Sequence, residues 1–583
     1  MSAANVGWEV LVNERKSSPN PLANDRAISR QIDELERISQ YERDRALGRD
    51  YFQDIEDFYN LCENTAVTSP SYKPLVKIPQ LQTLVLNEAT DISDCSPKVY
   101  ILNNEKDERD KPREEWFQAN WYQGCYNNRI MEAEIWAMLS NLGFLQPCFD
   151  PYGRKGQGTT YLKLRHPKSV YPDPYAKSDS DWTWLIMHDW MYIDDVWRLW
   201  PEKGRYVRPH VYASDADPYG NVDGALEFPE LSPLSVGTDG GQERKIFRDN
   251  RVLVRHCYMF DNTREAVKEY DGTRQFSDLL VHPRFRYKYP DGRWITECEG
   301  VILADGNNWC PQLPDDDRGT FPLIRIAAMP TITNFWGPPP VQMTRSIQRL
   351  SERVYTQFFE NIVRLNNGVI VIQNNTGLSK SDIGWIPGEV IMINQGSQAP
   401  QVISPQVIPA QQLAIPDKLL AIQKELQGFS GARQGDTGGG NISPDLFDAA
   451  LWQSKPMTRM RGRLLAESLL RLSSILFRIM CRYQQSPQRL FGGIREDKVI
   501  QHEWEPIEDS AISDYDMHVD EGSLQVLSGT MLRSAVSAMA KANLLPTKTV
   551  LETIGIPDAE QIAEEKTREL ELGAMAKLRK ARG

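Results

Sequence analysis

The pattern of apolar and polar positions divides this chain of 583 residues into helical and β-rich stretches. Residues 24–63 and roughly 112–142 carry apolar side chains at helical spacing, whereas residues 144–330 alternate with a period of two. The apolar face of the first stretch consists of Ile32, Leu35, Ile38 and Tyr41. The strand candidates are 161–166, 182–190, 251–260 and 293–303. We therefore expect N-terminal helices followed by an antiparallel β domain.

Turn residues indicate how the predicted strands connect. Pro290-Asp291-Gly292 predicts a hairpin between residues 285–289 and the strand that starts at Arg293. Asp305-Gly306-Asn307 predicts the end of the next strand. The segment GRKGQGTT (153–160) has the glycine spacing of a phosphate-binding loop, but Thr159 stands where the phosphate-contacting lysine belongs. We interpret this segment as a hairpin turn.

The alternation stops near Gly337, and a long amphipathic helix is predicted from 341 to 366. At a rise of 1.5 Å per residue this helix would be about 39 Å long. Its apolar stripe consists of Ile347, Leu350, Val354, Phe358, Ile362 and Leu365. The residues largely off that stripe are Arg345, Arg349, Arg353 and Arg364. Asn366-Asn367-Gly368 is typical of a left-handed helix end.

A small β-rich insertion and a second helix follow. The apolar segments 369–373, 389–393 and 401–408 are too short to form a core, so we expect this module to pair with neighbours, including other copies of itself. A helix from 416 to 429 then returns to a glycine-rich loop at 431–443. Helices that go out, pass through a small β module and come back suit a protein built around an axis.

The last part of the chain is again helical. Ser443 is a typical N-cap, and Pro444 takes the first position of a helix that could reach Tyr483. Pro456 lacks a backbone donor and predicts a kink in this helix, or a helix that ends and restarts. Glutamate and arginine interrupt its apolar part, so we expect no membrane span. Helical pattern recurs from about residue 521 to the end.

Composition narrows the class of protein. The chain is 40% apolar and 25% charged, as in folded soluble proteins, and we expect two to four structural units. The N-terminal sequence lacks the apolar core of a secretion signal. The formal net charge of −12 argues against broad, tight binding of nucleic acid, because such binding relies on Lys and Arg that displace counterions. The same net charge is compatible with a protein along whose surface nucleic acid slides.

Several chemical motifs are incomplete. The eight cysteines form no CxxC pair and the seven histidines no HxH or HxxxH pair, so we expect neither a metal site nor a cofactor. Residues 215–226 resemble a calcium loop, but Leu226 replaces the closing carboxylate, which favours a solvated loop. Asp315-Asp316-Asp317 is a solvated turn or an opportunistic divalent-ion site. The tryptophans from Trp182 to Trp200 favour a buried aromatic cluster over base or sugar stacking.

Residues 321–482 resemble the portal protein of tailed bacteriophages. The resemblance rests on FPLIRIAAMP, on FWGPPPVQMTRSIQRLSERVYTQFFENIVRLNNG, on the β insertion and on LQGFSGARQGDTGGGNISPDLFDAALWQSKPMTRMRGRLLAESLL. Residues 70–99 and 171–201 have the same character. The likeness covers most of the chain and lies in the order and texture of its elements. Portal proteins offer no catalytic residues to carry over, so the resemblance implies a protein that is not an enzyme.

The resemblance implies an α+β, portal-like fold. In chain order its parts are an antiparallel β-rich wing with N-terminal helices (1–336), an outgoing stem helix (337–366), a small α/β clip (367–414), a returning stem helix (415–430), a tunnel loop (431–442), a long kinked helix with a return strand of the wing (443–520) and a helical crown (521–583). Such a protein forms a ring, usually of twelve subunits, at one capsid vertex.

The resemblance also implies partners and a location. Double-stranded DNA enters through the ring, driven by a separate terminase whose large subunit docks on the clip, and later leaves by the same route. The other implied partners are the major capsid protein and the head–tail adaptor or tail proteins, with no membrane involved. The implied location is the virion, reached from the host cytoplasm during assembly.

The tunnel loop is the implied contact with DNA. Its flexible positions are Gly431, Gly435, Gly438, Gly439 and Gly440. The residues expected to face the channel are Arg433, Gln434, Asp436, Thr437 and, on the returning helix, Lys424. A single loop cation with a carboxylate nearby would limit friction on the passing polyanion. The same glycines would also suit an ordinary exposed linker.

Two other functions stay open from the sequence. One is an enzyme of carbohydrate or phosphate chemistry that uses the Asp- and Trp-rich β domain, in which Asp215 and Asp217 would be the residues to test. The other is a monomeric adaptor or scaffold that binds a protein through its helical tail. The number of subunits in the purified protein separates both from a ring.

Overall fold

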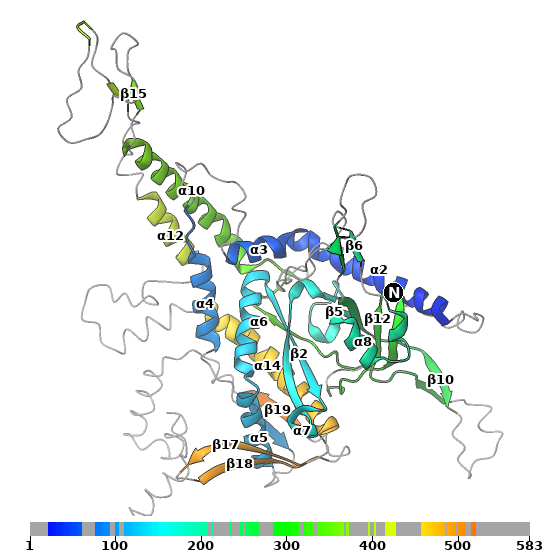
Figure 1. Cartoon of the computed structure of the whole chain (residues 1–583). Helices are drawn as coiled ribbons and strands as arrows, with labels where there is room; N and C mark the ends of the chain where they lie inside the picture. Colours follow the sequence, from blue (N-terminus) through cyan, green and yellow to red (C-terminus); the bar gives the residue numbers. More distant parts are fainter. Residues whose placement is uncertain are drawn as a thin grey trace, which may run out of the picture. The chain divides into compact units, whose positions relative to one another are not determined.

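The computed structural model describes residues 21–60, 76–93, 99–103, 110–207, 211–213, 234–235, 245–248, 251–267, 284–314, 316, 319–331, 335–366, 369–371, 394–396, 401–403, 414–426, 456–484, 487–495, 498–507 and 515–519. Helices and antiparallel strand pairs make up this part of the chain, which confirms the α+β class (Figure 1). The chain divides into two compact units. Unit 1 comprises Met1–Phe52, Val85–Pro340 and Gly428–Gly583, and unit 2 comprises Gln53–Leu84 and Val341–Gln427.

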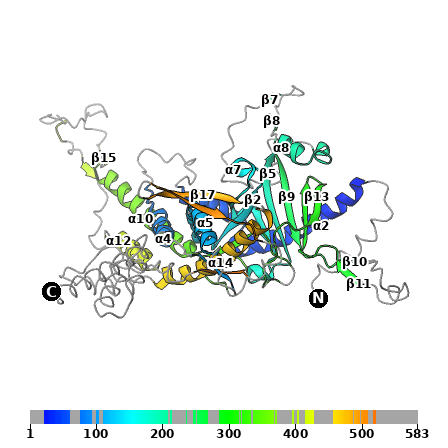
Figure 2. The same cartoon turned by 90° about the horizontal axis from the view of Figure 1, so that it is seen from below.

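A five-stranded antiparallel sheet is central to unit 1. Its strand order is β13 (Val301–Asn307), β12 (Arg293–Cys298), β9 (Arg251–Met259), β5 (Trp184–Tyr192) and β4 (Val170–Pro172). Figure 2 shows β5, β9 and β13 of this sheet running alongside one another. The strands predicted at 182–190 and 251–260 are therefore confirmed.

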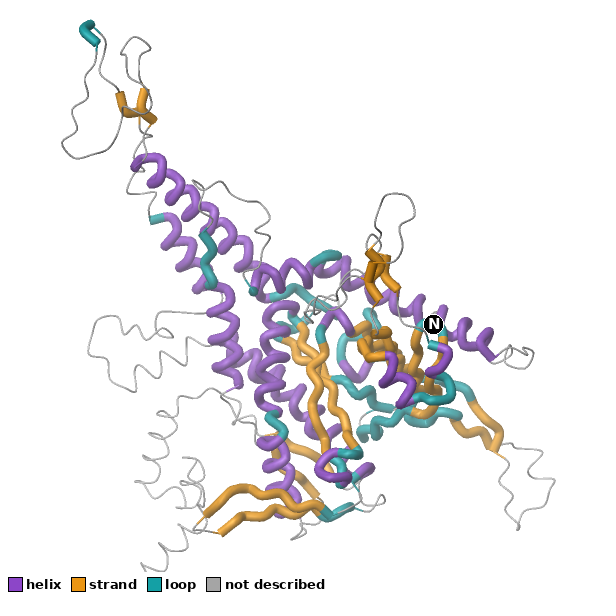
Figure 3. Tube along the Cα trace, viewed as in Figure 1, coloured by secondary structure: helices purple, strands orange, loops and turns teal. Residues whose placement is uncertain are grey.

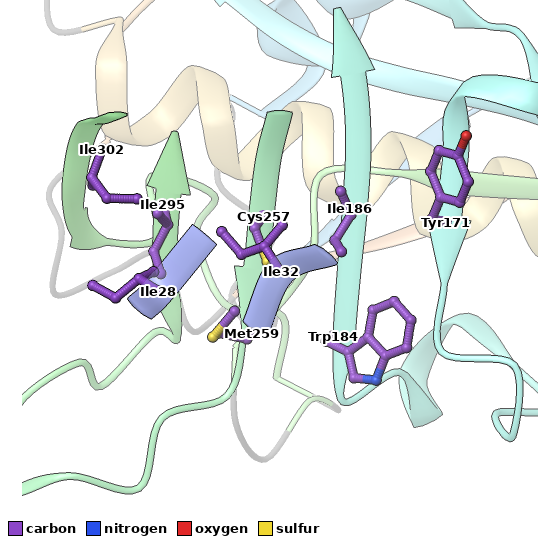
Figure 4. Close-up of a cluster of buried hydrophobic side chains, with 9 residues drawn as sticks. All are labelled: Ile28, Ile32, Tyr171, Trp184, Ile186, Cys257, Met259, Ile295 and Ile302. Carbon is purple, nitrogen blue, oxygen red and sulfur yellow. The ribbon is translucent and has the colours of Figure 1, made fainter. Parts of the chain in front are cut away.

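Side-chain alternation gives this sheet two separate apolar clusters. Helix α2 (Pro21–Leu47) covers the first, where its Ile28 and Ile32 contact the sheet (Figure 4). The sheet residues of that cluster are Tyr171, Trp184, Ile186, Cys257, Met259, Ile295 and Ile302. The short helix α8 (Ile193–Leu199) supplies Ile193 and Val196 to the second cluster. Its sheet residues are Val252, Val254, Cys298, Val301 and Leu303.

The predicted apolar face of residues 24–63 is correct only in its first half. Ile32 is fully buried and Leu35 packs partly against the same cluster, but Ile38 and Tyr41 are exposed. Polar contacts replace them. Ser39 Oγ donates a hydrogen bond to the Pro172 carbonyl at 2.8 Å, and Arg43 Nη1 donates to the Lys168 carbonyl at 2.8 Å. The stretch also consists of two helices, α2 and α3 (Tyr51–Tyr59), rather than one.

The hairpin predicted at Pro290-Asp291-Gly292 is wrong. Strand β11 (Arg284–Tyr287) pairs with β10 (Arg264–Val267), while both edges of β12 are occupied by β9 and β13. The turn at Tyr289–Gly292, closed by a 3.3 Å backbone hydrogen bond, thus passes the chain from one sheet to another. Asn307 ends β13, as Asp305-Gly306-Asn307 predicted.

The single strand predicted at 293–303 is instead a tight hairpin of β12 and β13. Cys298 pairs with Val301, which leaves a two-residue loop of Glu299 and Gly300. Both loop residues have positive φ, 49° and 82°. This is the backbone of a type I′ turn, whose twist matches that of the flanking strands.

A second sheet of unit 1 has the order β14 (Ile324–Ala327), β2 (Leu142–Asp150) and β3 (Thr159–Arg165). Asp150 pairs with Thr159 across a turn that contains the short helix α7 (Gly153–Gly156), so the hairpin predicted at 153–160 is confirmed. Helices α6 (Tyr126–Ser140) and α14 (Pro456–Tyr483) both pack on this sheet. A Cβ on Gly143 would lie 2.0 Å from the Ala133 carbonyl oxygen, so α6 rests directly on the backbone of β2.

The remaining elements of unit 1 are smaller. Helix α5 (Asp110–Gln123) packs on β17 (Gln488–Arg495), β18 (Lys498–Trp504) and β1 (Val99–Asn103). Strand β1 pairs with β19 (Tyr515–Val519). A three-stranded sheet has the order β6 (Val211–Ala213), β8 (Lys245–Arg248) and β7 (Leu234–Ser235). Single 3₁₀ turns lie at Pro167–Ser169, Asp179–Asp181 and Gly204–Tyr206.

Unit 2 is mainly helical in the part of it that the structure describes (Figure 3). The chain runs out along α10 (Pro340–Asn366), pairs β15 (Val369–Val371) with β16 (Gln401–Ile403), and returns along α12 (Ile415–Leu426). The first turns of α4 (Gln80–Ser93) also belong to this unit. Of the predicted β segments, 389–393 lies outside the described residues.

Two general properties concern chemistry and membranes. Each cysteine among the described residues is a free thiol, and Cys257, Cys298, Cys310 and Cys481 are buried. Among the helices described above, none combines the length and the apolar character that crossing a bilayer requires.

Candidate functional site

Two of the positions singled out from the sequence lie in described helices. Lys424 is half-buried in the last turn of α12, and Pro456 is the first described residue of α14. The loop 431–442 lies outside the described residues, with Arg433, Gln434, Asp436, Thr437, Gly431, Gly435, Gly438, Gly439 and Gly440. The lumen-facing loop and the kink at Pro456 therefore stay predictions. Asp215 and Asp217 also lie outside the described residues.

Helix α10 is attached to unit 2 through a polar side. The Gln348 side chain accepts a hydrogen bond from Leu81 N at 2.9 Å and donates one to the Ile78 carbonyl at 2.6 Å. Glu352 Oε1 accepts from Ile78 N at 3.2 Å, and Thr356 Oγ1 accepts from Val76 N at 3.2 Å. Side chains at helical spacing thus donate to and accept from backbone groups of residues 76–81.

The apolar stripe that the sequence shows on α10 is exposed or only half-buried. Leu350 and Ile362 are 49% and 46% exposed. The other stripe residues, Ile347, Val354, Phe358 and Leu365, are only half-buried. The buried positions of α10 include polar residues instead, namely Thr344, Gln348 and Ser351. The physical reason is the set of backbone hydrogen bonds above, which occupies the polar side.

Arginines form a groove along a further side of α10. The residues that line it are Gln342, Arg345, Ser346, Arg349, Leu350 and Arg353. Arg345 Nη2 donates to the Asp54 carbonyl at 3.1 Å, and its guanidinium lies 5.2 Å from the centre of the buried Phe58 ring. The Arg349 guanidinium lies 5.5 Å from the same ring. Cation–π contacts of this kind hold the two side chains over the ring.

Helix α12 touches α10 at one polar pair and exposes most of its apolar residues. Tyr355 of α10 donates from its hydroxyl to Asp417 Oδ1 at 3.4 Å. Ile415, Ile422 and Leu426 are all exposed. The buried residues of α12 are Pro416 and Gln423. Unit 2 therefore presents apolar residues on both of its long helices.

A buried charge cluster fixes the beginning of α14 in unit 1. Glu88 of α4 is fully buried, and its Oε1 lies 2.8 Å from Arg461 Nη1 and accepts from Thr458 Oγ1 at 2.8 Å. Glu134 of α6 interacts electrostatically with both Arg461 and Glu88. Burial raises the pKa of Glu134 to about 8; Arg461 opposes this shift and Glu88 adds to it. Glu134 is therefore mostly protonated at neutral pH.

The β domain contains a second network of charges, on the sheet face that α2 covers. Arg255 binds Glu297, Glu36 and Asp33, with 2.5 Å between its Nε and Glu297 Oε2. Burial alone would raise the pKa of Glu36, but His188 at 3.2 Å and Arg255 lower it to about 2. Glu36 is therefore ionised, and the ion pairs of Arg255 with Glu36 and Asp33 join α2 to the sheet.

The other face of that sheet holds His256 beside Asp189. Burial lowers the pKa of His256 to about 4, although Asp189 at 3.6 Å opposes the shift, so the imidazole is neutral. Asp189 is also bound by Arg165 Nη1 at 2.5 Å. Within the described ranges, no group of three or more His, Cys, Asp or Glu side chains is arranged to hold a metal ion. Trp182 and Trp184 are buried as predicted, whereas Trp197 is exposed.

The polar attachment of α10 was missed in the sequence, although a signal for it exists. Thr344, Gln348, Glu352 and Thr356 follow one another at intervals of four, which places them on one side of a helix. A polar side of this kind is normally exposed to solvent. Here it meets backbone groups of residues 76–81, which lie far away in the sequence.

Comparisons with known proteins add no relative. No protein-family model matches the sequence, and no curated protein matches it either.

Proposed function

We propose that this chain is the subunit of a portal ring, in which copies of α10 and α12 surround a passage for double-stranded DNA. The ring, with twelve subunits as the resemblance implies, would occupy one vertex of a capsid and bind the major capsid protein. The β15–β16 end of unit 2 would bind terminase during packaging and the head–tail adaptor afterwards. The enclosed DNA would pass without sequence-specific contacts.

The observation that carries the proposal is the inverted burial of α10. Its polar residues Thr344, Gln348 and Ser351 are buried, while Leu350 and Ile362 remain about half exposed. Removing apolar side chains from water is favourable, and those of α10 spread over several helical turns. Another surface is therefore expected to cover them. A second copy of the same chain is the partner that a symmetric assembly provides.

Charge supports the second part of the proposal. Twelve copies of a chain with net charge −12 carry about −144 in total (12 × −12). A tunnel lined by many unpaired cations would hold DNA through counterion release, and the affinity would then fall steeply with salt. An acidic ring with few cations at its lumen avoids that retention.

The test is the mass of the purified protein together with its shape in electron micrographs. We expect rings of about 800 kDa, from twelve chains of 66.7 kDa. The variant Leu350→Asp/Ile362→Asp should reduce their yield, whereas Tyr152→Asp, a change at an exposed tyrosine of unit 1, should not. A folded wild-type monomer at all concentrations would overturn the proposal and favour a monomeric adaptor.

A further inference from the structure

The two long helices of unit 2 expose different chemistry on opposite sides. Tyr355, which binds Asp417 of the same chain, marks the side of α10 that faces α12. Arg353 is two residues away, which is about 200° around a helix of 3.6 residues per turn. Arg353 and its groove therefore point away from the α12 of the same chain.

Helix α12 shows the corresponding arrangement. Asp417 marks its side toward α10, and Ile415 and Leu426 lie about 160° and 180° around the helix from it. Both are exposed, as is Glu425 next to Leu426. No hydrogen bond or ion pair joins Glu425 or Arg353 to another residue in the described part of the chain. Both residues are thus exposed, and neither is paired within the part of the chain that the structure describes.

Each helix also carries two opposite charges at equal spacing: on α10 they lie on the outward side, and on α12 they lie on a flank about 80–100° around the helix from Asp417. Arg353 and Glu360 are seven residues apart on α10, and Lys418 and Glu425 are seven residues apart on α12. Seven residues make nearly two turns, so each pair shares one side of its helix, about 10 Å apart. When two helices run antiparallel, Arg353 can meet Glu425 while Glu360 meets Lys418.

We propose that the arginine groove of α10 receives α12 of a second copy of this chain in antiparallel orientation, with Arg353 opposite Glu425 and Glu360 opposite Lys418. Leu350, which lines the groove, then packs against the exposed Leu426. The inference rests on the proposed ring and specifies the contact between its neighbouring subunits.

This contact is directional, which fits closure into a ring. One side of the α10–α12 pair carries the groove and the other carries the acidic and apolar ridge of α12. A contact between unlike surfaces is heterologous and repeats from copy to copy until the rotation closes. Two identical surfaces would instead form a two-fold dimer and stop.

Charge reversal and its rescue test the inference. Arg353→Glu alone and Glu425→Arg alone each place like charges opposite one another, and each should raise the chain concentration needed for half-maximal ring formation by roughly tenfold. The double variant Arg353→Glu/Glu425→Arg restores the opposite pair and should return that concentration close to the wild-type value. The control Arg198→Glu changes an exposed arginine of α8 in unit 1 and should have no effect. Native mass spectrometry over a concentration series provides the measurement.

The outcomes separate the inference from the proposed function. If the wild-type chain forms rings and both single variants form them equally well, the inference is overturned and the ring stands. If single variants lose rings and the double variant does not regain them, the pairing of Arg353 with Glu425 is overturned. If Arg353→Glu leaves rings intact but weakens salt-dependent retention of duplex DNA, the groove is a phosphate site, which also overturns it. If the wild-type protein is a monomer at every concentration, the proposed function itself is overturned.

Discussion

Glu88 and Arg461 form a buried ion pair that joins α4 to α14 across 373 positions of sequence, with 2.8 Å between Oε1 and Nη1. Neither side chain has appreciable contact with water, so each charge depends on the other for its stabilisation. The pair holds the first turns of α14, the helix that follows the glycine-rich loop in the chain.

Removal of one partner should therefore destabilise unit 1. Arg461→Ala removes the cation that faces the buried carboxylate of Glu88, and we expect a loss of about 3–5 kcal/mol in the free energy of unfolding. Chemical denaturation measured by circular dichroism provides the value. The control Arg463→Ala, at an exposed position of the same helix, should change stability by less than about 0.5 kcal/mol. Equal effects of the two variants would contradict the role of the pair.

Glu134 should make stability depend on pH in the opposite sense to a typical salt-bridged carboxylate. Its folded pKa is raised from 4.5 to about 8, so between these values the folded state holds a proton that the unfolded state has lost. Stability should therefore fall as pH rises from about 4.5 to 8. Glu134→Gln should remove this dependence and stabilise the protein at pH 8 by roughly 4 kcal/mol.

A pair of denaturation series at pH 5.5 and pH 8 measures this effect. Glu132→Gln is the matched control, because Glu132 lies on the same helix with an exposed ion pair to Arg129 at 2.7 Å. That variant should show the same pH dependence as the wild type. A Glu134→Gln protein with an unchanged difference between the two pH values would refute the assignment.

The hydrogen bonds from the polar side of α10 to residues 76–81 predict a local loss of stability in unit 2 when Gln348 is replaced. Gln348→Ala removes the side-chain acceptor of Leu81 N and one of the two donors to the Ile78 carbonyl, which should cost about 1–3 kcal/mol locally. Hydrogen exchange at the Leu81 amide should accelerate by about tenfold or more. Gln342→Ala, on the exposed side of α10, should leave that amide as protected as in the wild type. An unchanged exchange rate at the Leu81 amide in Gln348→Ala would show that these hydrogen bonds do not hold residues 76–81 in place.

The role of the glycines in the predicted tunnel loop can be tested separately from assembly. Replacement of Gly438, Gly439 and Gly440 by alanine restricts the backbone states of the loop. We expect intact rings but impaired DNA packaging or retention, measured as the fraction of DNA-filled particles. Normal packaging by that variant would favour an exposed linker without a role at the lumen.

Local signals in the sequence predicted much of the fold. Alternation located β5 and β9, and the β-like sequence around 153–160 indicated the hairpin of β2 and β3, because these patterns depend on neighbours in the chain. The turn at Glu299 and Gly300 was also local but was overlooked inside an apolar run. A glycine in the middle of a predicted strand is the signal that would have found it.

The parts that could not be predicted depend on distant contacts. The amphipathic character of α10 was evident, but the side that the chain itself buries is decided by the backbone of residues 76–81. Likewise, nothing near Glu134 in the sequence indicates that Glu88 and Arg461 lie beside it. Amphipathicity identifies two sides of a helix, and only the tertiary structure assigns each side to its neighbour.

Because the polar side of α10 is the buried one, the resistance of unit 2 to proteases should depend on the concentration of the chain. Within a solitary chain, Gln348 and its neighbours anchor the helix mainly by hydrogen bonds, whose net contribution is modest. Under the proposed contact between copies, mass action would link the resistance of α10 and α12 to proteases to the concentration of the chain. Scarce chains would be degraded early, and abundant chains would protect one another.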